Sequence, residues 1–148
     1  MNIKENILDD KLIIEIGKFA VLWNLFEKEH CNNNCNREKI KIACEFIVID
    51  QEKQAKFAQA LNKRREWFKQ LYLDFINTNL YSDNKKPTDE EIEAIKCFLN
   101  QDGKDWTYGC LLCVYRIRNN MMHGLKDIEK LNKQIGIFQA VNEILESI

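Results

Sequence analysis

Arg118, Asn119 and His123 are the residues whose types and spacing are best suited to chemistry on a phosphate group. They lie in residues 114–124, VYRIRNNMMHG, which projection at about 100° per residue predicts to be the last turns of a helix. Arg118 projects into the apolar arc of this helix, where a guanidinium requires a carboxylate or a phosphate as its partner. Asn119 and His123 share the polar arc, and Gly124 is expected to end the helix. The apolar arc is formed by Cys110, Leu111, Val114, Tyr115, Ile117, Met121 and Met122.

This set of side chains is suited to cleavage of RNA without a metal ion. RNA carries its own nucleophile, the 2′-hydroxyl, so cleavage requires mainly proton transfer and stabilisation of the charged phosphorane. His123 would transfer protons, Arg118 would hold the non-bridging oxygens, and Asn119 would orient the imidazole. On an ideal helix, however, Arg118 and His123 point about 140° apart. One helix is therefore not expected to assemble the whole site alone.

The spacing of this segment resembles the Arg-x4–6-His motif of the HEPN superfamily, with polar Asn119 directly after the Arg and Gly124 directly after the His. Residues 22–27, LWNLFE, are similar to the first-helix Trp and Glu signature of several HEPN groups. The resemblance covers nearly the whole chain. It implies a compact all-α helical bundle, a metal-independent endoribonuclease of toxin–antitoxin or phage-defence systems, no cofactor, and a homodimer whose two motifs line one cleft. RNA is then the substrate, and an antitoxin or another defence-system protein is a candidate partner. Auxiliary site residues under this hypothesis are Asn24, Glu27 and Asn120.

Two other interpretations stay open at the level of sequence. One is a HEPN-like fold that has lost catalysis and binds a nucleotide or phosphate as a regulatory module, and the other is an unrelated helical bundle with a chance motif. Glu27 bears on this choice because it also projects into an apolar arc. It either neutralises Arg118 across a helix pair, which favours the binding module, or extends along the helix end into solvent.

Length and composition are those of one globular domain spanning residues 1–148. The net charge of −1 gives no global attraction to nucleic acid, so RNA binding would depend on local basic patches. The run 63–65 and Lys85-Lys86 either line a phosphate path or form a solvated surface. Candidate RNA-binding residues are Lys63, Arg64, Arg65, Arg116 and Lys126.

The chain has six cysteines and no apolar run long enough to span a bilayer, and its first residues do not have the layout of a signal peptide. We therefore expect a cytoplasmic protein without membrane association, whose cysteines are reduced. Cys31-x3-Cys35 and Cys110-x2-Cys113 could supply four thiolates to a zinc ion, but Cys110 and Cys113 project into a helix core, where free cysteine is common. We predict no bound metal.

The scarcity of Gly and Pro and the helical spacing of apolar residues predict helices almost throughout, about five or six in number. The first runs from Asp9 or Asp10 to Glu29, and the second carries Ile40 and Phe46 and ends near residues 50–51, with Asn36 as its N-cap. A long helix then reaches about Asn79, followed by a polar loop at 81–87. A Thr88–Glu91 capping box starts the next helix, the motif helix begins near Lys104, and a final helix follows Gly124.

Overall fold

The computed structural model describes residues 9–63, 87–124 and 134–148, with side chains in the second range described as far as residue 119. These residues form helices and turns and contain no strand, so the predicted all-α fold is confirmed for the part of the chain that they cover. The described helices are α1 (Asp10–His30), α2 (Arg37–Ala43), α3 (Gln51–Lys63), α5 (Asp89–Asn100), α6 (Thr107–Gly124) and α8 (Ile135–Glu146).

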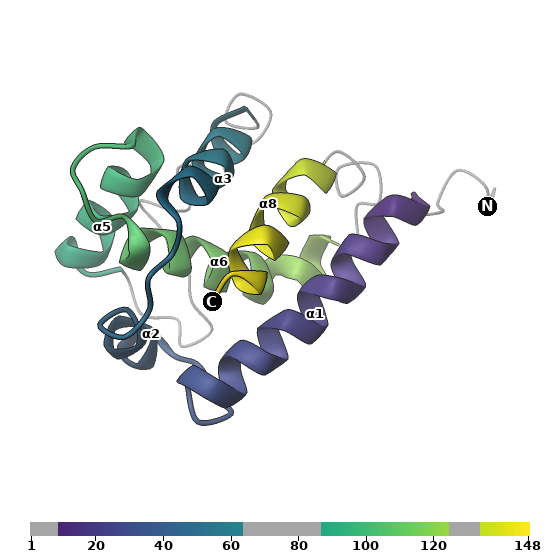
Figure 1. Ribbon diagram of the computed structural model, residues 1–148, viewed down its shortest axis with the longest axis horizontal. Coiled ribbons are helices and arrows are strands. Elements are labelled where there is room, and N and C mark those ends of the chain that lie inside the picture. The colour runs from purple at the N-terminus through teal and green to yellow at the C-terminus, as the bar shows by residue number, and fades with distance from the viewer. Residues whose placement is uncertain (1–8, 64–86, 125–133) are drawn as a thin grey trace.

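Helix α6 lies at the centre of the molecule, with α5 on one side and α1 on the other (Figure 1). Helix α8 packs along α1 and against α3, which in turn contacts α5. From Cys110 to Tyr115 every side chain of α6 is buried, so this helix is apolar all round and not on one face alone. Cys110 and Cys113 are buried as predicted, and Leu112, which the predicted apolar arc did not include, also belongs to the core. Edge-to-face contact of Phe19 with Phe138 joins α1 to α8, and packing of Phe57 against Phe98 joins α3 to α5.

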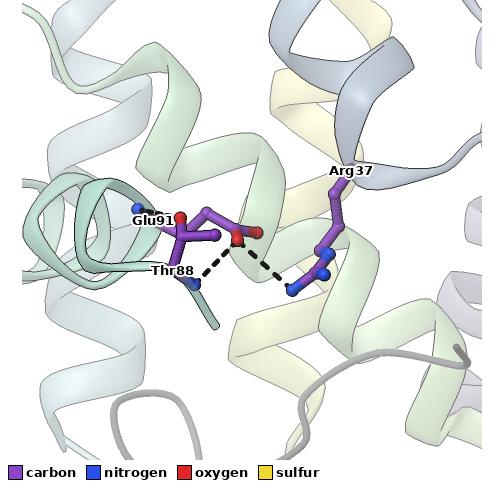
Figure 2. A network of polar contacts seen from close by, with 3 residues as sticks. All are labelled: Arg37, Thr88 and Glu91. Carbon is purple, nitrogen blue, oxygen red and sulfur yellow. Dashed lines mark hydrogen bonds and ion pairs between the residues drawn. The ribbon is translucent and has the colours of Figure 1, made fainter. Parts of the chain in front are cut away.

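Side-chain caps start the helices where the sequence predicts them. The Asn36 side chain accepts a hydrogen bond from the backbone N–H of Lys39 (2.8 Å). The Thr88 hydroxyl accepts one from the N–H of Glu91, whose carboxylate in return accepts from the Thr88 N–H (2.9 Å). Both predicted caps are confirmed, and Figure 2 shows that Glu91 also faces Arg37 from α2. The capping box thus forms part of a contact between α2 and α5.

Two predicted helix boundaries are wrong. Helix α2 ends at Ala43 instead of continuing to residues 50–51, and the chain then turns and becomes extended over residues 47–50. In this stretch Ile47 and Ile49 are buried while Phe46 and Val48 are exposed, the alternation of an extended backbone. The motif helix begins at Thr107 and not near Lys104, because residues 102–106 are not helical. The predicted helix beyond Lys63, the loop at 81–86 and the start of the final helix before residue 134 lie outside the described residues.

Gly109 lies at a close contact between α6 and α5. A Cβ atom built there would lie 2.1 Å from the carbonyl oxygen of Ala94 and 2.9 Å from Cβ of Phe98. The first obstacle is backbone, so the two helices must separate to admit even a methyl group. The glycine therefore sets how near α6 can approach α5.

Replacing Gly109 by alanine should lower the free energy of unfolding by about 1–3 kcal/mol, the usual cost of overpacking. Gly17→Ala is the matched control, since Gly17 is also helical and a Cβ there meets nothing within 4 Å. It should be neutral or stabilising by about 0.5–1 kcal/mol. Urea titrations followed by circular dichroism would measure both, and equal stability of the two variants would contradict the close α5–α6 contact.

The outer surface of α1 is unusually apolar for a helix at the edge of the molecule. Ile14, Val21 and Leu25 are more than half exposed there, and by helical spacing they lie opposite the core residues Phe19 and Trp23. Among the described residues, no helix is long and apolar enough to cross a bilayer.

Candidate functional site

The candidate site begins where α6 leaves the core. Side chains are buried from Cys110 to Tyr115, and exposure then increases, so that the Arg118 side chain is 47% exposed. Arg118 therefore does not lie in a closed apolar seam, as its projection suggested, but at the rim of the core. Its backbone belongs to a helix that is packed into the core, while its guanidinium is accessible to solvent. Such a group can bind an anion that comes from outside the chain.

Glu27 of α1 faces Arg118. Its side chain is 12% exposed, and its Oε1 lies 3.8 Å from Nη2 of Arg118. The predicted meeting of these two opposite charges is confirmed, whereas extension of Glu27 into solvent is wrong. The separation is that of an ion pair, but it is too long for a hydrogen bond. Glu27 therefore neutralises Arg118 without occupying its donors.

A tight turn at the end of α1 holds Glu27 in place. The Glu27 carbonyl accepts hydrogen bonds from the N–H groups of Cys31 (3.0 Å) and Asn33 (2.8 Å). Its Oε2 accepts a third from the buried N–H of Cys35 (3.2 Å). Cys31 and Cys35 are joined by a disulfide, which corrects the expectation that all six cysteines are reduced. The Cys-x3-Cys spacing around three asparagines is the signal in the sequence that could have indicated this bond.

Asn119 is bonded to Arg118. Its Oδ1 accepts a hydrogen bond from Nη1 of Arg118 (3.0 Å), and its Nδ2 is buried without a partner. The predicted role of Asn119 was to orient His123, whose side chain lies outside the described part of the chain. That role therefore stays a prediction, and the bond that the structure shows is one that orients the guanidinium. The buried Nδ2 of Asn119 is an unused donor, from which an imidazole nitrogen could accept a hydrogen bond.

The other candidate residues are less close to this site or are not described. Asn24 is exposed on α1, one turn before Glu27, and Arg116 is half-buried on α6. Lys63 lines a separate groove of about 770 Å³ between α3 and α8, to which α6 contributes no residue. The structure therefore does not join Lys63 to Arg118. The candidates outside the described residues are the side chains of Asn120 and His123 and the whole of Arg64, Arg65, Lys85, Lys86 and Lys126.

The four-cysteine arrangement is not assembled. Cys31 and Cys35 are bonded to each other, and Cys110 and Cys113 are buried in α6. Burial raises the pKa of both α6 thiols well above the usual range, which disfavours the thiolate that zinc requires. Within the described ranges, no group of three or more His, Cys, Asp or Glu residues could hold a metal ion.

No family model, curated protein or solved structure matches this chain. The site must therefore be interpreted from its own geometry. A half-exposed guanidinium, oriented by an amide and balanced by a carboxylate 3.8 Å away, lies on the helix that also carries His123 five residues further on.

Proposed function

We propose that the chain is a metal-independent endoribonuclease of the HEPN type, acting as a toxin or phage-defence effector. The observation that carries the proposal is the Arg118 guanidinium, which is about half exposed and is oriented by Asn119. Glu27 faces Arg118 without a hydrogen bond, so the donors that a phosphate would use stay available. The position of the group at the end of a buried helix supports a preorganised role.

The chemistry follows from the residue types. The 2′-hydroxyl of the RNA attacks the adjacent phosphorus, and the 5′-oxygen of the next nucleotide leaves. Arg118 stabilises the negative charge that develops on the non-bridging oxygens, with its planar set of donors. His123 transfers a proton as general acid or base, and its place at the C-terminal end of α6 favours the protonated imidazole.

A homodimer is part of the proposal. Helix α6 continues through residue 124, so Arg118 and His123 belong to one regular helix and diverge by about 140° around its axis. A two-fold contact would bring a second Arg118 and a second His123 to the same cleft. Arg118 of one protomer could then hold the phosphate on which His123 of the other acts. An antitoxin or another defence-system protein that covers this cleft would inhibit the enzyme.

The second candidate function is a phosphate- or nucleotide-binding module without catalysis. The pairing of Glu27 with Arg118 favours it, because a carboxylate next to the guanidinium lowers the affinity for an anion and stabilises a structural contact. Under this hypothesis the protein would bind RNA weakly and leave it intact.

Cleavage without metal separates the two functions. Single-stranded RNA should be cut in EDTA and should yield a 2′,3′-cyclic phosphate and a 5′-hydroxyl, while DNA of the same sequence should remain intact because it lacks the nucleophile. A single 2′-O-methyl group at the scissile position should block cleavage there. Mass spectrometry of the products would identify the ends. Cutting of the methylated substrate, or a requirement for divalent metal, would reject this mechanism.

A further inference from the structure

The disulfide-closed turn at residues 31–35 is built around Glu27. Two of its N–H groups donate to the Glu27 carbonyl, and a third, from Cys35, donates to the carboxylate. Asn32 and Asn33 have left-handed backbone conformations, with φ of 52° and 70°. Asparagine tolerates this region better than most residues do, but two such residues in sequence still cost conformational energy. The Cys31–Cys35 bond closes the turn across them.

The Cys35 N–H matters because the Glu27 carboxylate is mostly buried. A buried carboxylate must be compensated by donors or by a positive charge. Here the two oxygens are divided, since Oε2 is hydrogen-bonded by the turn while Oε1 faces Arg118 across 3.8 Å. If the Cys35 N–H moved away, Oε2 would lose its donor. Arg118 is the cation that the structure places against Glu27, so the carboxylate would be expected to close onto the guanidinium as a two-pronged pair.

Closure of that pair would remove Arg118 from any other anion. We propose that the Cys31–Cys35 disulfide regulates the site by holding Glu27 off Arg118, so that the oxidised protein presents Arg118 to phosphate and the reduced protein sequesters it. This inference rests on the proposed function and adds its regulation. The chemical step is ordinary exchange: a dithiol reductant supplies two electrons and two protons, Cys31 and Cys35 become thiols, and the reductant becomes a disulfide.

The test measures binding of an uncleavable RNA, a short single strand methylated at every 2′-oxygen, by fluorescence anisotropy. Cys31→Ser with Cys35→Ser should weaken binding by about tenfold, the difference made by one charge-assisted hydrogen bond. Adding Glu27→Gln to this pair should restore affinity, because a neutral amide holds the guanidinium less strongly. The gain from Glu27→Gln should be larger in this background than with the disulfide intact, whereas a merely structural role of the disulfide would give equal gains. Cys97→Ser, at a free cysteine on α5, is the matched control and should change nothing.

The same bond can also be opened in the unaltered protein, by refolding it in excess TCEP. This second measurement does not depend on the stability of the serine variant. It should show the same loss of affinity, and reoxidation should reverse it. Unchanged affinity after reduction, or a loss that Glu27→Gln fails to restore, would overturn the inference.

Failure of the ribonuclease proposal can be distinguished from failure of the disulfide inference. If the oxidised protein neither cuts nor binds RNA, the ribonuclease proposal fails. The contact between Glu27 and Arg118 can then still be followed without RNA, at the Arg118 side chain itself. Proton exchange of its Nε–H, followed by NMR, should slow when the disulfide is opened, because the guanidinium becomes enclosed in an ion pair. Exchange that does not change on reduction would reject the regulatory contact by itself.

Discussion

Replacing His123 by alanine should lower the rate of RNA cleavage by about 10²–10⁴-fold, the usual contribution of a general acid or base. RNA affinity should change little, because the phosphate is held by Arg118. The chain offers a matched control, since its only other histidine is His30. That ring packs against Phe26 of the same helix, with centroids 5.1 Å apart, and His30→Ala should leave the rate nearly unchanged. An undiminished rate in His123→Ala would leave the phosphate-binding module as the better account.

The same assay examines Arg118 and the shared cleft. Arg118→Lys should also impair cleavage, because an ammonium keeps the charge but loses the planar pair of donors. If two protomers form one site, mixing Arg118→Ala and His123→Ala chains should recover part of the activity that each variant lacks. Sedimentation would show whether the active species is a dimer. Full activity of a monomer would reject the shared site while leaving the roles of Arg118 and His123 unaffected.

The largest effect on stability is expected at Glu91. Its Oε1 accepts hydrogen bonds from the Thr88 N–H (2.9 Å) and from Nη1 of Arg37 (3.2 Å), and its side chain is only 4% exposed against 13% for Arg37 (Figure 2). Glu91→Ala removes both the carboxylate that a buried guanidinium faces and half of the capping box. The free energy of unfolding should fall by about 3–5 kcal/mol, as is usual when one partner of a buried pair is removed.

Glu90 provides the matched control for this prediction. It is the neighbouring residue, it carries the same charge in the same helical turn, and it also pairs with a cation of α2, Lys41, at 2.9 Å. Both side chains are more than half exposed, so Glu90→Ala should cost less than about 1 kcal/mol. Denaturant titrations of the two variants would measure the difference. Equal losses would show that burial of the Arg37–Glu91 pair contributes nothing to stability.

The features that the sequence predicts correctly are local ones, together with a single long-range pair. Asn36 and Thr88 cap helices because their partners are three residues away, within the same turn. The meeting of Glu27 and Arg118 was predictable because each charge interrupts an apolar arc, and two misfits of opposite sign gain by contact.

The missed features depend on partners that periodicity does not reveal. Arg37 and Glu91 are 54 positions apart, and neither interrupts a helical pattern strongly enough to indicate a buried pair. The end of α2 at Ala43 depends on Ile47 and Ile49 finding a core in an extended conformation. The Cys31–Cys35 bond was missed because the expected cellular location decided against it. The exposure of Arg118 depends on where the surrounding helices end. The sequence of α6 alone does not indicate this.

Helix α6 is enclosed by its neighbours from Cys110 to Tyr115 and fixed against α5 at Gly109, so it can neither rotate nor slide without repacking the core. The direction in which Arg118 points is therefore determined by the number of residues that separate it from Gly109. Inserting or deleting one residue in this interval would turn the guanidinium by about 100° around the axis, away from Glu27. Variation in the length of this segment should be tolerated far less than variation in its side chains. A library could combine apolar substitutions with single-residue insertions at 110–117. Variants that still bind or cleave RNA should come almost only from the substitutions.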